Sequence, residues 1–194
     1  GAELTVGFTV TGLLEGAPIT LAGARPGDRL ILTRPIGSGT ILAGEMAGQA
    51  RGADVAAVLA EMARSQGTVA EALAGAHAMT DVTGFGLAGH LMGMCEASGV
   101  AAQISLDAVP VYPGAEALAA QGVRSSLYEA TRGVAVRMKL PKTDLAALLF
   151  DPQTSGGLLA AVSQEDADAV LARQDIPAWD IGEITEGTPF IEVR

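Results

Sequence analysis

The sequence predicts a single α+β domain over residues 1–194, built as a mixed β-sheet with helices packed largely on one face. Segments with strand and helix periodicity alternate irregularly along the chain, without an internal repeat or a linker. Hydrophobic residues make up 49% of the sequence. A chain of 194 residues buries most of the surface that it exposes when unfolded, so a hydrophobic core is expected without disulfides or metals.

In the first half of the chain, two different periods of apolar residues define the predicted elements. Residues 4–11 alternate between apolar and polar side chains, which is the pattern of a half-buried strand. From Asp54 onward, apolar residues recur at the i, i+3, i+4 and i+7 spacing of an amphipathic helix. The strands predicted here lie at residues 4–11, 28–33 and 78–82. Three helices are predicted: one begins near Thr40, one begins at Asp54, and one covers residues 68–76.

In the second half, capping residues mark where helices begin and end. A glycine turn after residue 82 opens a helix that buries Cys95, and Gly99 ends it because glycine tolerates the left-handed cap conformation. Ser163 followed by Asp166 is an N-terminal capping pattern. The remaining predicted elements are strands at residues 101–106, 158–162, 179–184 and 190–193, and helices at residues 115–120, at residues 144–150 and after Ser163.

Composition excludes several classes of protein. The net charge of −10 opposes nucleic-acid binding, which requires an excess of Lys and Arg. The single Cys95 excludes an intramolecular disulfide and a cysteine-clustered zinc site, and we expect it to be an inert core thiol. No apolar run reaches the ~18 residues of a membrane span, and residues 1–7 lack a signal-peptide pattern. These features predict a globular protein of a reducing compartment.

The charge is unevenly distributed. Residues 124–142 contain five basic residues and one acidic residue, and therefore carry a net charge of +4. The basic residues are Arg124, Arg132, Arg137, Lys139 and Lys142. A solvated loop and helix end explains this stretch, and a surface that contacts an anion is the alternative.

A glycine motif after residue 82 permits two functional interpretations. Gly84, Gly86 and Gly89 match the G-x-G-x-x-G dinucleotide fingerprint, with Asp107 about 20 residues later. The preceding strand is not a continuous apolar run, and Asp81 would face the pyrophosphate, so we disfavour a dinucleotide site. A carboxylate beside a glycine turn at a helix N-terminus can instead hold Mg²⁺ while backbone N–H groups face phosphate oxygens. A turn or helix-capping role for Asp81 is equally compatible with the spacing.

The other polar motifs carry less information. His77 and His90 lack a second ligand at i+4, which favours packing or capping roles. Gly-x-Ser-x-Gly does not occur in the sequence. The turns at residues 37–39 and 154–157 contain the glycine and hydroxyl groups of anion sites, although such turns are more often purely structural. The residues themselves thus predict a magnesium–phosphate surface that lacks most of its parts.

Longer motifs resemble those of a known family. TDVTGFGLAGHL at residues 80–91 closely resembles the signature of selenophosphate synthetases (selenide, water dikinases). DPQTSGGLL at residues 151–159 resembles the second C-terminal signature of that family. The surrounding segments at residues 27–46, 106–115 and 181–184 are similar as well, so the resemblance covers nearly the whole chain. It implies the fold of the C-terminal domain of the aminoimidazole ribonucleotide (AIR) synthetase-like superfamily.

The resemblance also implies an activity for a longer parent enzyme. Such a parent uses ATP and Mg²⁺ to convert selenide and water to selenophosphate, with release of AMP and phosphate. Its N-terminal ATP-binding domain carries the glycine-rich loop, the catalytic Cys or selenocysteine, the Lys and most magnesium ligands, and is absent from these 194 residues. We therefore expect no catalytic residue in this chain and no activity of the isolated domain. The parent is expected to be a cytoplasmic homodimer that binds neither nucleic acid nor membrane.

The resemblance assigns candidate site residues by position. Asp81 matches the family's metal-binding aspartate of this domain. The weaker candidates for cofactor binding are Thr83, Gly84, Gly86, Thr154 and Ser155, and Asp151 belongs to the same second loop. One segment departs from the family: residues 122–138 replace the usual Gly-Gly-Thr…Arg-Asn stretch. That departure leaves open a non-catalytic accessory or regulatory module of the same fold, including one within a fused protein.

Overall fold

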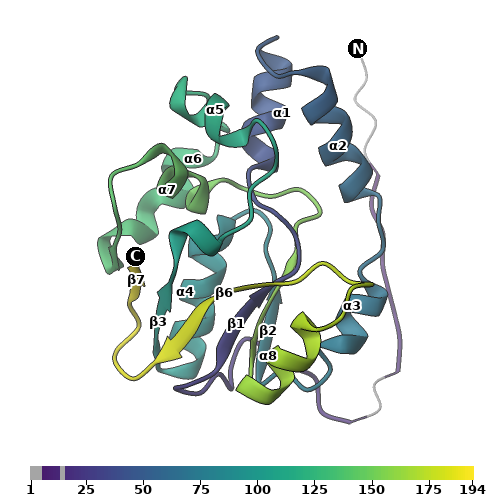
Figure 1. Ribbon diagram of the computed structural model, residues 1–194, viewed down its shortest axis with the longest axis vertical. Coiled ribbons are helices and arrows are strands. Elements are labelled where there is room, and N and C mark those ends of the chain that lie inside the picture. Colours follow the sequence, from purple (N-terminus) through teal and green to yellow (C-terminus); the bar gives the residue numbers. More distant parts are fainter. Residues whose placement is uncertain (1–5, 14–15) are drawn as a thin grey trace.

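The computed structural model describes residues 6–13 and 16–194, which contain a mixed seven-stranded β-sheet covered by helices (Figure 1). The strand order is β2-β5-β1-β6-β3-β7-β4. Neighbouring strands are antiparallel from β2 to β3 in this order and parallel from β3 to β4. The strands are β1 (Arg29–Leu32), β2 (Ala78–Asp81), β3 (Ala101–Ile104), β4 (Met138–Lys139), β5 (Leu158–Val162), β6 (Trp179–Thr185) and β7 (Ile191–Val193). The predicted mixed sheet is confirmed.

Helices connect most of the strands. The α-helices are α1 (Ser38–Met46), α2 (Gly52–Met62), α3 (Gly67–Ala72), α4 (Gly86–Ser98), α5 (Ala115–Ala120), α6 (Tyr128–Thr131), α7 (Asp144–Ala147) and α8 (Gln164–Leu171). Three 3₁₀ helices are η1 (Leu106–Ala108), η2 (Arg132–Arg137) and η3 (Leu148–Phe150). Gly99 ends α4 with φ 69° and the Ser163 hydroxyl caps α8, as the sequence predicts. None of the helices in the described ranges is long and apolar enough to cross a membrane.

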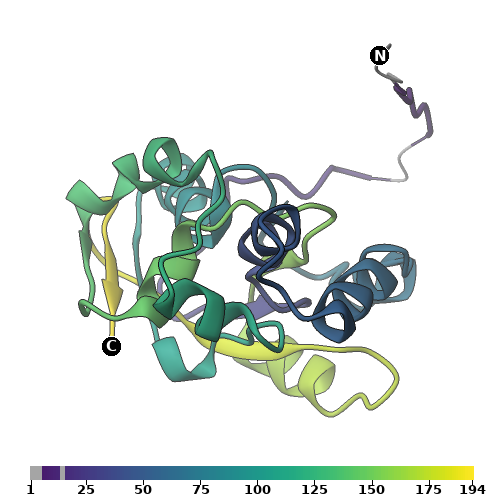
Figure 2. The same ribbon diagram turned by 90° about the horizontal axis from the view of Figure 1, so that it is seen from above.

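Two hydrophobic clusters lie on opposite faces of the sheet because successive side chains of a strand alternate between faces. Leu30 and Leu32 belong to the larger cluster, which includes the buried faces of α4 and α5, whereas Ile31 belongs to the smaller one under α3 and α8. Figure 2 shows α4 and α8 on the two sides of the sheet. The two faces are covered unequally, in agreement with the predicted asymmetry of the α+β layer.

The sheet brings two loops to one end. In the described residues β2 has β5 as its neighbour in the sheet, and Asp81, the last residue of β2, pairs with Leu158, the first residue of β5. Because the two strands are antiparallel, the segment that follows β2 lies beside the segment that precedes β5. This antiparallel arrangement also differs from the parallel βαβ unit that a dinucleotide fingerprint requires.

Three predictions about individual segments need correction. Residues 6–11 form no strand, and Phe8 and Val10 are exposed, while residues 4 and 5 lie outside the described residues. A strand requires a neighbour for its backbone hydrogen bonds, and alternation alone does not supply one. The helix predicted at residues 68–76 ends at Ala72, and the turn after it has hydrogen bonds that reach only three residues back, from the Ala74 N–H to Glu71 and from the Ala76 N–H to Leu73. The stretch at residues 124–142, interpreted as a solvated loop and helix end, contains in addition the 3₁₀ helix η2 and the strand β4 beside the short helix α6.

Candidate functional site

Asp81 lies where the edge strand β2 opens into a turn. Its side chain is exposed, and the Thr80 hydroxyl is 3.5 Å from its Oδ1 atom. Among the described residues no cation forms an ion pair with it. The next residue is fixed firmly, since the Val82 N–H donates to the Gly157 carbonyl at 2.8 Å. The exposed carboxylate therefore stands on a fixed backbone.

The turn after Asp81 is held from within by a histidine. The Thr83 N–H donates to Nε2 of His90 at 3.0 Å. Burial lowers the pKa of His90, and the nearby Asp81 carboxylate opposes this shift only in part. The ring is therefore neutral at physiological pH, with Nε2 free to accept. The sequence predicted packing or capping for His90, and the structure shows that it positions the turn beside Asp81.

Gly86 allows the turn to approach the second loop closely. Its φ of +68° is in the left-handed region, and a Cβ atom there would lie 2.9 Å from the Leu149 carbonyl oxygen. Gly84 is exposed, and a Cβ atom there would meet nothing within 4 Å. Of the two glycines predicted to form the turn, Gly86 is thus the one that the backbone geometry requires.

Gln153 connects the second loop to the start of α1. Its Oε1 atom accepts from the Gly37 N–H at 3.0 Å, the Ser38 N–H at 3.1 Å and the Ser38 hydroxyl at 2.9 Å. The Gln153 N–H donates to the Thr83 carbonyl at 2.9 Å, which links this loop to the turn after Asp81. The N–H groups of the turn at residues 37–39, considered as an anion site from the sequence, are therefore already satisfied within the chain.

Asp151 completes the attachment of the loop to α1. Its carboxylate is buried and accepts from the Gly39 N–H at 2.9 Å, the Thr40 hydroxyl at 2.8 Å and the Gln153 side-chain amide at 3.0 Å. Burial raises the pKa of Asp151 despite these hydrogen bonds. Asp151 is thus the cap of α1, a role that sequence spacing cannot indicate because the two segments are more than 110 residues apart.

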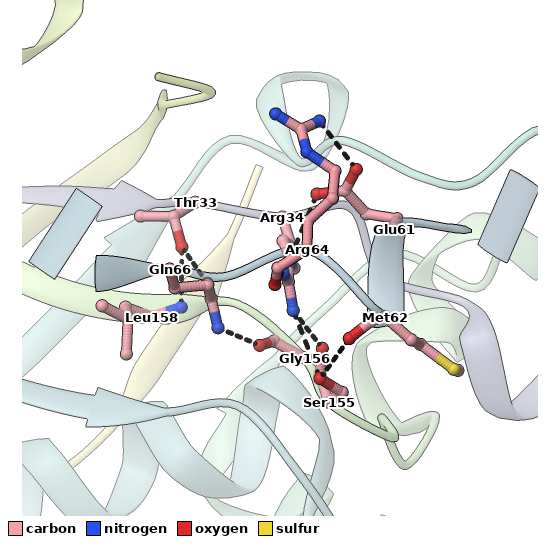
Figure 3. A network of polar contacts seen from close by, with 9 residues as sticks. All are labelled: Thr33, Arg34, Glu61, Met62, Arg64, Gln66, Ser155, Gly156 and Leu158. Atoms are coloured by element: carbon pink, nitrogen blue, oxygen red, sulfur yellow. Dashed lines mark hydrogen bonds and ion pairs between the residues drawn. The ribbon is translucent and has the colours of Figure 1, made fainter. Parts of the chain in front are cut away.

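Contacts within the chain hold Ser155 in place (Figure 3). It is the one non-glycine residue with positive φ, 48°, in the described part of the chain. Its carbonyl accepts from the buried guanidinium of Arg34 at 2.7 Å, and its hydroxyl donates to the Met62 carbonyl at 3.1 Å. Arg34 also pairs with Glu61 at 3.2 Å and donates to the Arg64 carbonyl. The polar groups of Ser155 are therefore occupied by the chain itself.

The glycines that follow Ser155 allow close packing of the loop. A Cβ atom on Gly156 would lie 1.9 Å from the Val82 carbonyl oxygen, and one on Gly157 would lie 2.6 Å from the Arg34 nitrogen. Gln66 donates to the Gly156 carbonyl at 2.9 Å and accepts from Thr33 at 3.1 Å (Figure 3). Side chains at these two glycines would separate the loop from β1 and from the turn after β2.

A surface pocket of about 640 Å³ opens beside the two loops. Its lining includes Gly84 from the first loop and the exposed Thr154 from the second. The remaining lining residues come from α1 and the residue after it, from the segment before α6, and from the second loop: Gly39, Leu42, Ala43, Met46, Ala47, Arg124, Ser125, Ser126, Leu127, Pro152 and Gln153. The structure thus brings the two sequence motifs together at one edge, with Asp81 on the same turn as Gly84.

The side chains at this turn suit a cation site to which the protein contributes one ligand, the carboxylate of Asp81. No cluster of three or more His, Cys, Asp or Glu side chains that could hold a metal is present in the ranges that the structure describes. Mg²⁺ requires about six oxygens and takes one or two protein carboxylates together with phosphate and water. One exposed carboxylate fits that pattern as a single ligand. By contrast, burial raises the pKa of the Cys95 thiol to about 12, in keeping with an inert core residue.

Comparison with known proteins gives relatives over nearly the whole chain. The family described as "AIR synthase related protein, C-terminal domain" matches residues 25–193. A selenide, water dikinase of Nitratidesulfovibrio vulgaris is 37% identical over 99% of this chain and 59% of its own length. The selenide, water dikinase of Geobacter metallireducens is 40% identical over 88% and 51%, and that of Burkholderia pseudomallei is 39% identical over 98% and 57%. The chain spans about half the length of these curated relatives.

Solved structures share the fold. The thiamine-monophosphate kinase of Stenotrophomonas maltophilia superposes with a TM-score of 0.64 at 22% identity, over 90% of this chain and 52% of that one. A hydrogenase maturation protein HypE gives 0.62 at 22% identity, over 90% and 49%. Identities this low establish the architecture alone. The match of the family over residues 25–193 shows that the chain belongs to the AIR synthase related protein family and contains its C-terminal domain.

Proposed function

We propose that this chain is the C-terminal domain of a selenide, water dikinase. The parent enzyme would convert ATP, selenide and water to selenophosphate, AMP and phosphate. The observation that carries the proposal is the contact between the two motifs, in which Gln153 of DPQTSGG donates to the Thr83 carbonyl of TDVTGFG at 2.9 Å. The names and the 37–40% identity of the relatives support the same assignment.

In this proposal, Asp81 would hold a magnesium ion through one carboxylate oxygen. When bound, the ion neutralises the charge that develops during phosphoryl transfer. The exposed carboxylate is suited to this role because no ion pair in the described residues competes for it. The Thr83 N–H and the left-handed Gly86 hold the turn, and Gly84 and the exposed Thr154 line the adjacent pocket.

The proposal gives Ser155 an indirect role. Its carbonyl and hydroxyl are engaged by Arg34 and Met62, so we propose that it shapes the loop rather than contacts the nucleotide. The partner of the site is an N-terminal ATP-binding domain of the parent, which supplies the glycine-rich loop, the nucleophile, the Lys and the other magnesium ligands. We propose that the parent is a cytoplasmic homodimer and that the isolated 194-residue chain does not catalyse the dikinase reaction.

The test compares Asp81→Asn with Asp107→Asn in the full-length parent. The first change removes a charge at the proposed ligand, and the second removes an exposed acid on η1. We expect selenide-dependent AMP formation to fall by a factor of about 100 or more in Asp81→Asn, since removal of one preorganised electrostatic group typically costs that much. The thermal midpoint should stay near that of the wild type, because a surface carboxylate contributes little stability.

Four results would count against the proposal. Activity of Asp81→Asn near the wild-type level would make Asp81 a turn residue only, and unfolding of the variant would make its role structural. Selenide-dependent AMP formation by the isolated 194-residue chain would refute the requirement for an N-terminal domain. An upstream coding sequence without a glycine-rich loop, a Cys or selenocysteine codon and a Lys would favour an accessory module.

A further inference from the structure

The basic stretch at residues 124–142 surrounds a second surface pocket, separate from the turn that carries Asp81. The volume of this pocket is about 690 Å³. Volumes of 300–1,000 Å³ are typical of small-molecule sites. The lining consists of Arg124, Tyr128, Arg132, Ala135, Leu140, Pro141, Lys142, Thr143, Asp144, Ala146, Ala147 and Phe150.

The cations of this stretch fall into two groups. Arg137 pairs with Glu96, and Lys139 pairs with Glu192 at 2.8 Å, so a solvated, ion-paired surface explains those two. Arg132 and Lys142 line the pocket, are exposed, and make no side-chain hydrogen bond or ion pair with any described residue. In a chain of net charge −10, unpaired cations gathered at a concave surface are unexpected for a purely solubilising role.

The third cation of the pocket is fixed in place. The guanidinium of Arg124 donates to the Ala119 carbonyl at 2.6 Å and the Val123 carbonyl at 2.7 Å, and it lies 5.2 Å from the centre of the Tyr128 ring. Its Nη2 atom is 3.7 Å from Asp144, the one acidic residue of the lining. The charge of Arg124 therefore stays at the pocket without being fully neutralised, because this ion pair is long.

The floor between the cations is apolar. Tyr128 packs edge-on against Phe150 with ring centres 6.3 Å apart, and alanine and leucine side chains of η2, α7 and the segment after β4 complete it. The pocket thus combines a rim of three cations and one acid, a net charge of +2, with an apolar floor.

We propose that this pocket binds a phosphomonoester that carries an apolar or aromatic body. A phosphomonoester bears a charge of about −1.5 to −2 at pH 7, which matches the net charge of the lining. The phosphate contacts Arg132 and Lys142 at the rim, and the organic body covers the Tyr128 ring and the alanine floor. The pocket volume far exceeds a bare phosphate ion, so the organic body contributes part of the affinity. This inference does not rest on the proposed dikinase activity.

The test is titration of the 194-residue chain by isothermal calorimetry with three probes at pH 7.5: AMP, inorganic phosphate and adenosine. We expect saturable binding of AMP, weaker binding of phosphate and the weakest binding of adenosine. Arg132→Gln and Lys142→Gln should each weaken AMP binding about twofold to fivefold, and the double variant should weaken it further. The control Arg51→Gln removes an exposed arginine that does not line the pocket and should leave the affinity unchanged.

Four outcomes would overturn the proposal. One is the absence of saturable AMP binding up to millimolar concentration, and another is equal loss of affinity in Arg51→Gln. Phosphate that binds as tightly as AMP would remove the role of the apolar floor. Binding that is unaffected in the Arg132→Gln, Lys142→Gln double variant would place the ligand elsewhere. Thermal midpoints of all variants near the wild-type value would show that a lost affinity is not lost folding.

Discussion

Replacement of Asp151 by alanine is the sharpest test of how the second loop is held. The carboxylate is only 1% exposed and is the acceptor for the Gly39 N–H, the Thr40 hydroxyl and the Gln153 amide. Alanine supplies no side-chain acceptor, so the Gly39 N–H and the buried Thr40 hydroxyl lose their partner. The Gln153 amide loses one acceptor but keeps its hydrogen bond to the backbone carbonyl of residue 151 at 2.6 Å. The start of α1 and the loop at residues 151–157 would lose their shared contact at once.

The expected magnitude follows mainly from the two donors that are left without a partner. A buried donor left without a partner costs roughly 1–3 kcal/mol. The full sum is reduced for two reasons: the Thr40 hydroxyl can rotate toward another acceptor, and the variant no longer buries a carboxyl whose pKa burial raises. We therefore expect the free energy of unfolding to fall by about 3–5 kcal/mol. For a domain of this size that corresponds to a decrease in thermal midpoint of about 6–20 °C.

The measurement is urea and thermal unfolding of the 194-residue chain, with Asp107→Ala as the control. Asp107 is an exposed acid of η1, and its loss should change the free energy of unfolding by less than about 0.5 kcal/mol. The loss of free energy of unfolding in Asp151→Asn should lie between those of Asp151→Ala and Asp107→Ala, because the amide oxygen of asparagine still accepts one hydrogen bond. A loss below about 1 kcal/mol in Asp151→Ala would refute the capping role of this carboxylate.

Two further predictions concern the helix that follows Asp81. Gly86→Ala should destabilise the chain by about 2–4 kcal/mol in urea unfolding, because φ is +68° and the new Cβ would meet the Leu149 carbonyl at 2.9 Å. Gly93→Ala on the same helix has open space and no positive φ, and should stabilise by about 0.5–1 kcal/mol; equal effects would contradict this reasoning. Burial lowers the pKa of His90 in the folded state. The contribution of His90 to the free energy of unfolding should therefore be complete above about pH 6.5 and be lost as pH falls through the lower folded-state pKa. The difference in free energy of unfolding between wild type and His90→Gln should narrow from pH 8 to pH 5. A difference that stays constant over that range would show that His90 does not accept from Thr83.

Local sequence signals predicted the elements well where the cause is local. Gly99 ends α4 in the left-handed conformation, and the Ser163 hydroxyl caps α8, because both effects act within one helical turn. Strand β5 matches its predicted range of residues 158–162, since its apolar run is buried on both faces. Residues 6–11 alternate between apolar and polar side chains but have no neighbouring strand in the described residues, so the alternation alone gave a wrong prediction there.

The contacts of the candidate site were beyond local prediction. The family resemblance identified Asp81, and the structure places it exposed at the end of an edge strand, as the proposed role requires. The roles of Arg34, Gln153 and His90 depend on partners that only folding brings near. Arg34 and Ser155 are 121 residues apart in the chain, and no spacing rule connects them. A buried arginine in a strand-to-helix segment would be the one usable signal, since burial of arginine demands several acceptors.

The geometry of the loop at residues 151–157 argues for a supporting rather than a ligand-binding role for most of its residues. Asp151 and Gln153 use their side-chain oxygens on the start of α1, and Ser155 is held by Arg34. The Gln153 N–H then holds the Thr83 carbonyl, so the position of the turn beside Asp81 depends on this chain of buried polar contacts. Thr154 alone among these residues has an exposed side chain that faces the pocket. Substitution of a loop residue other than Thr154 should therefore lower activity by displacing Asp81. It should also lower the free energy of unfolding, which we do not expect for Asp81→Asn.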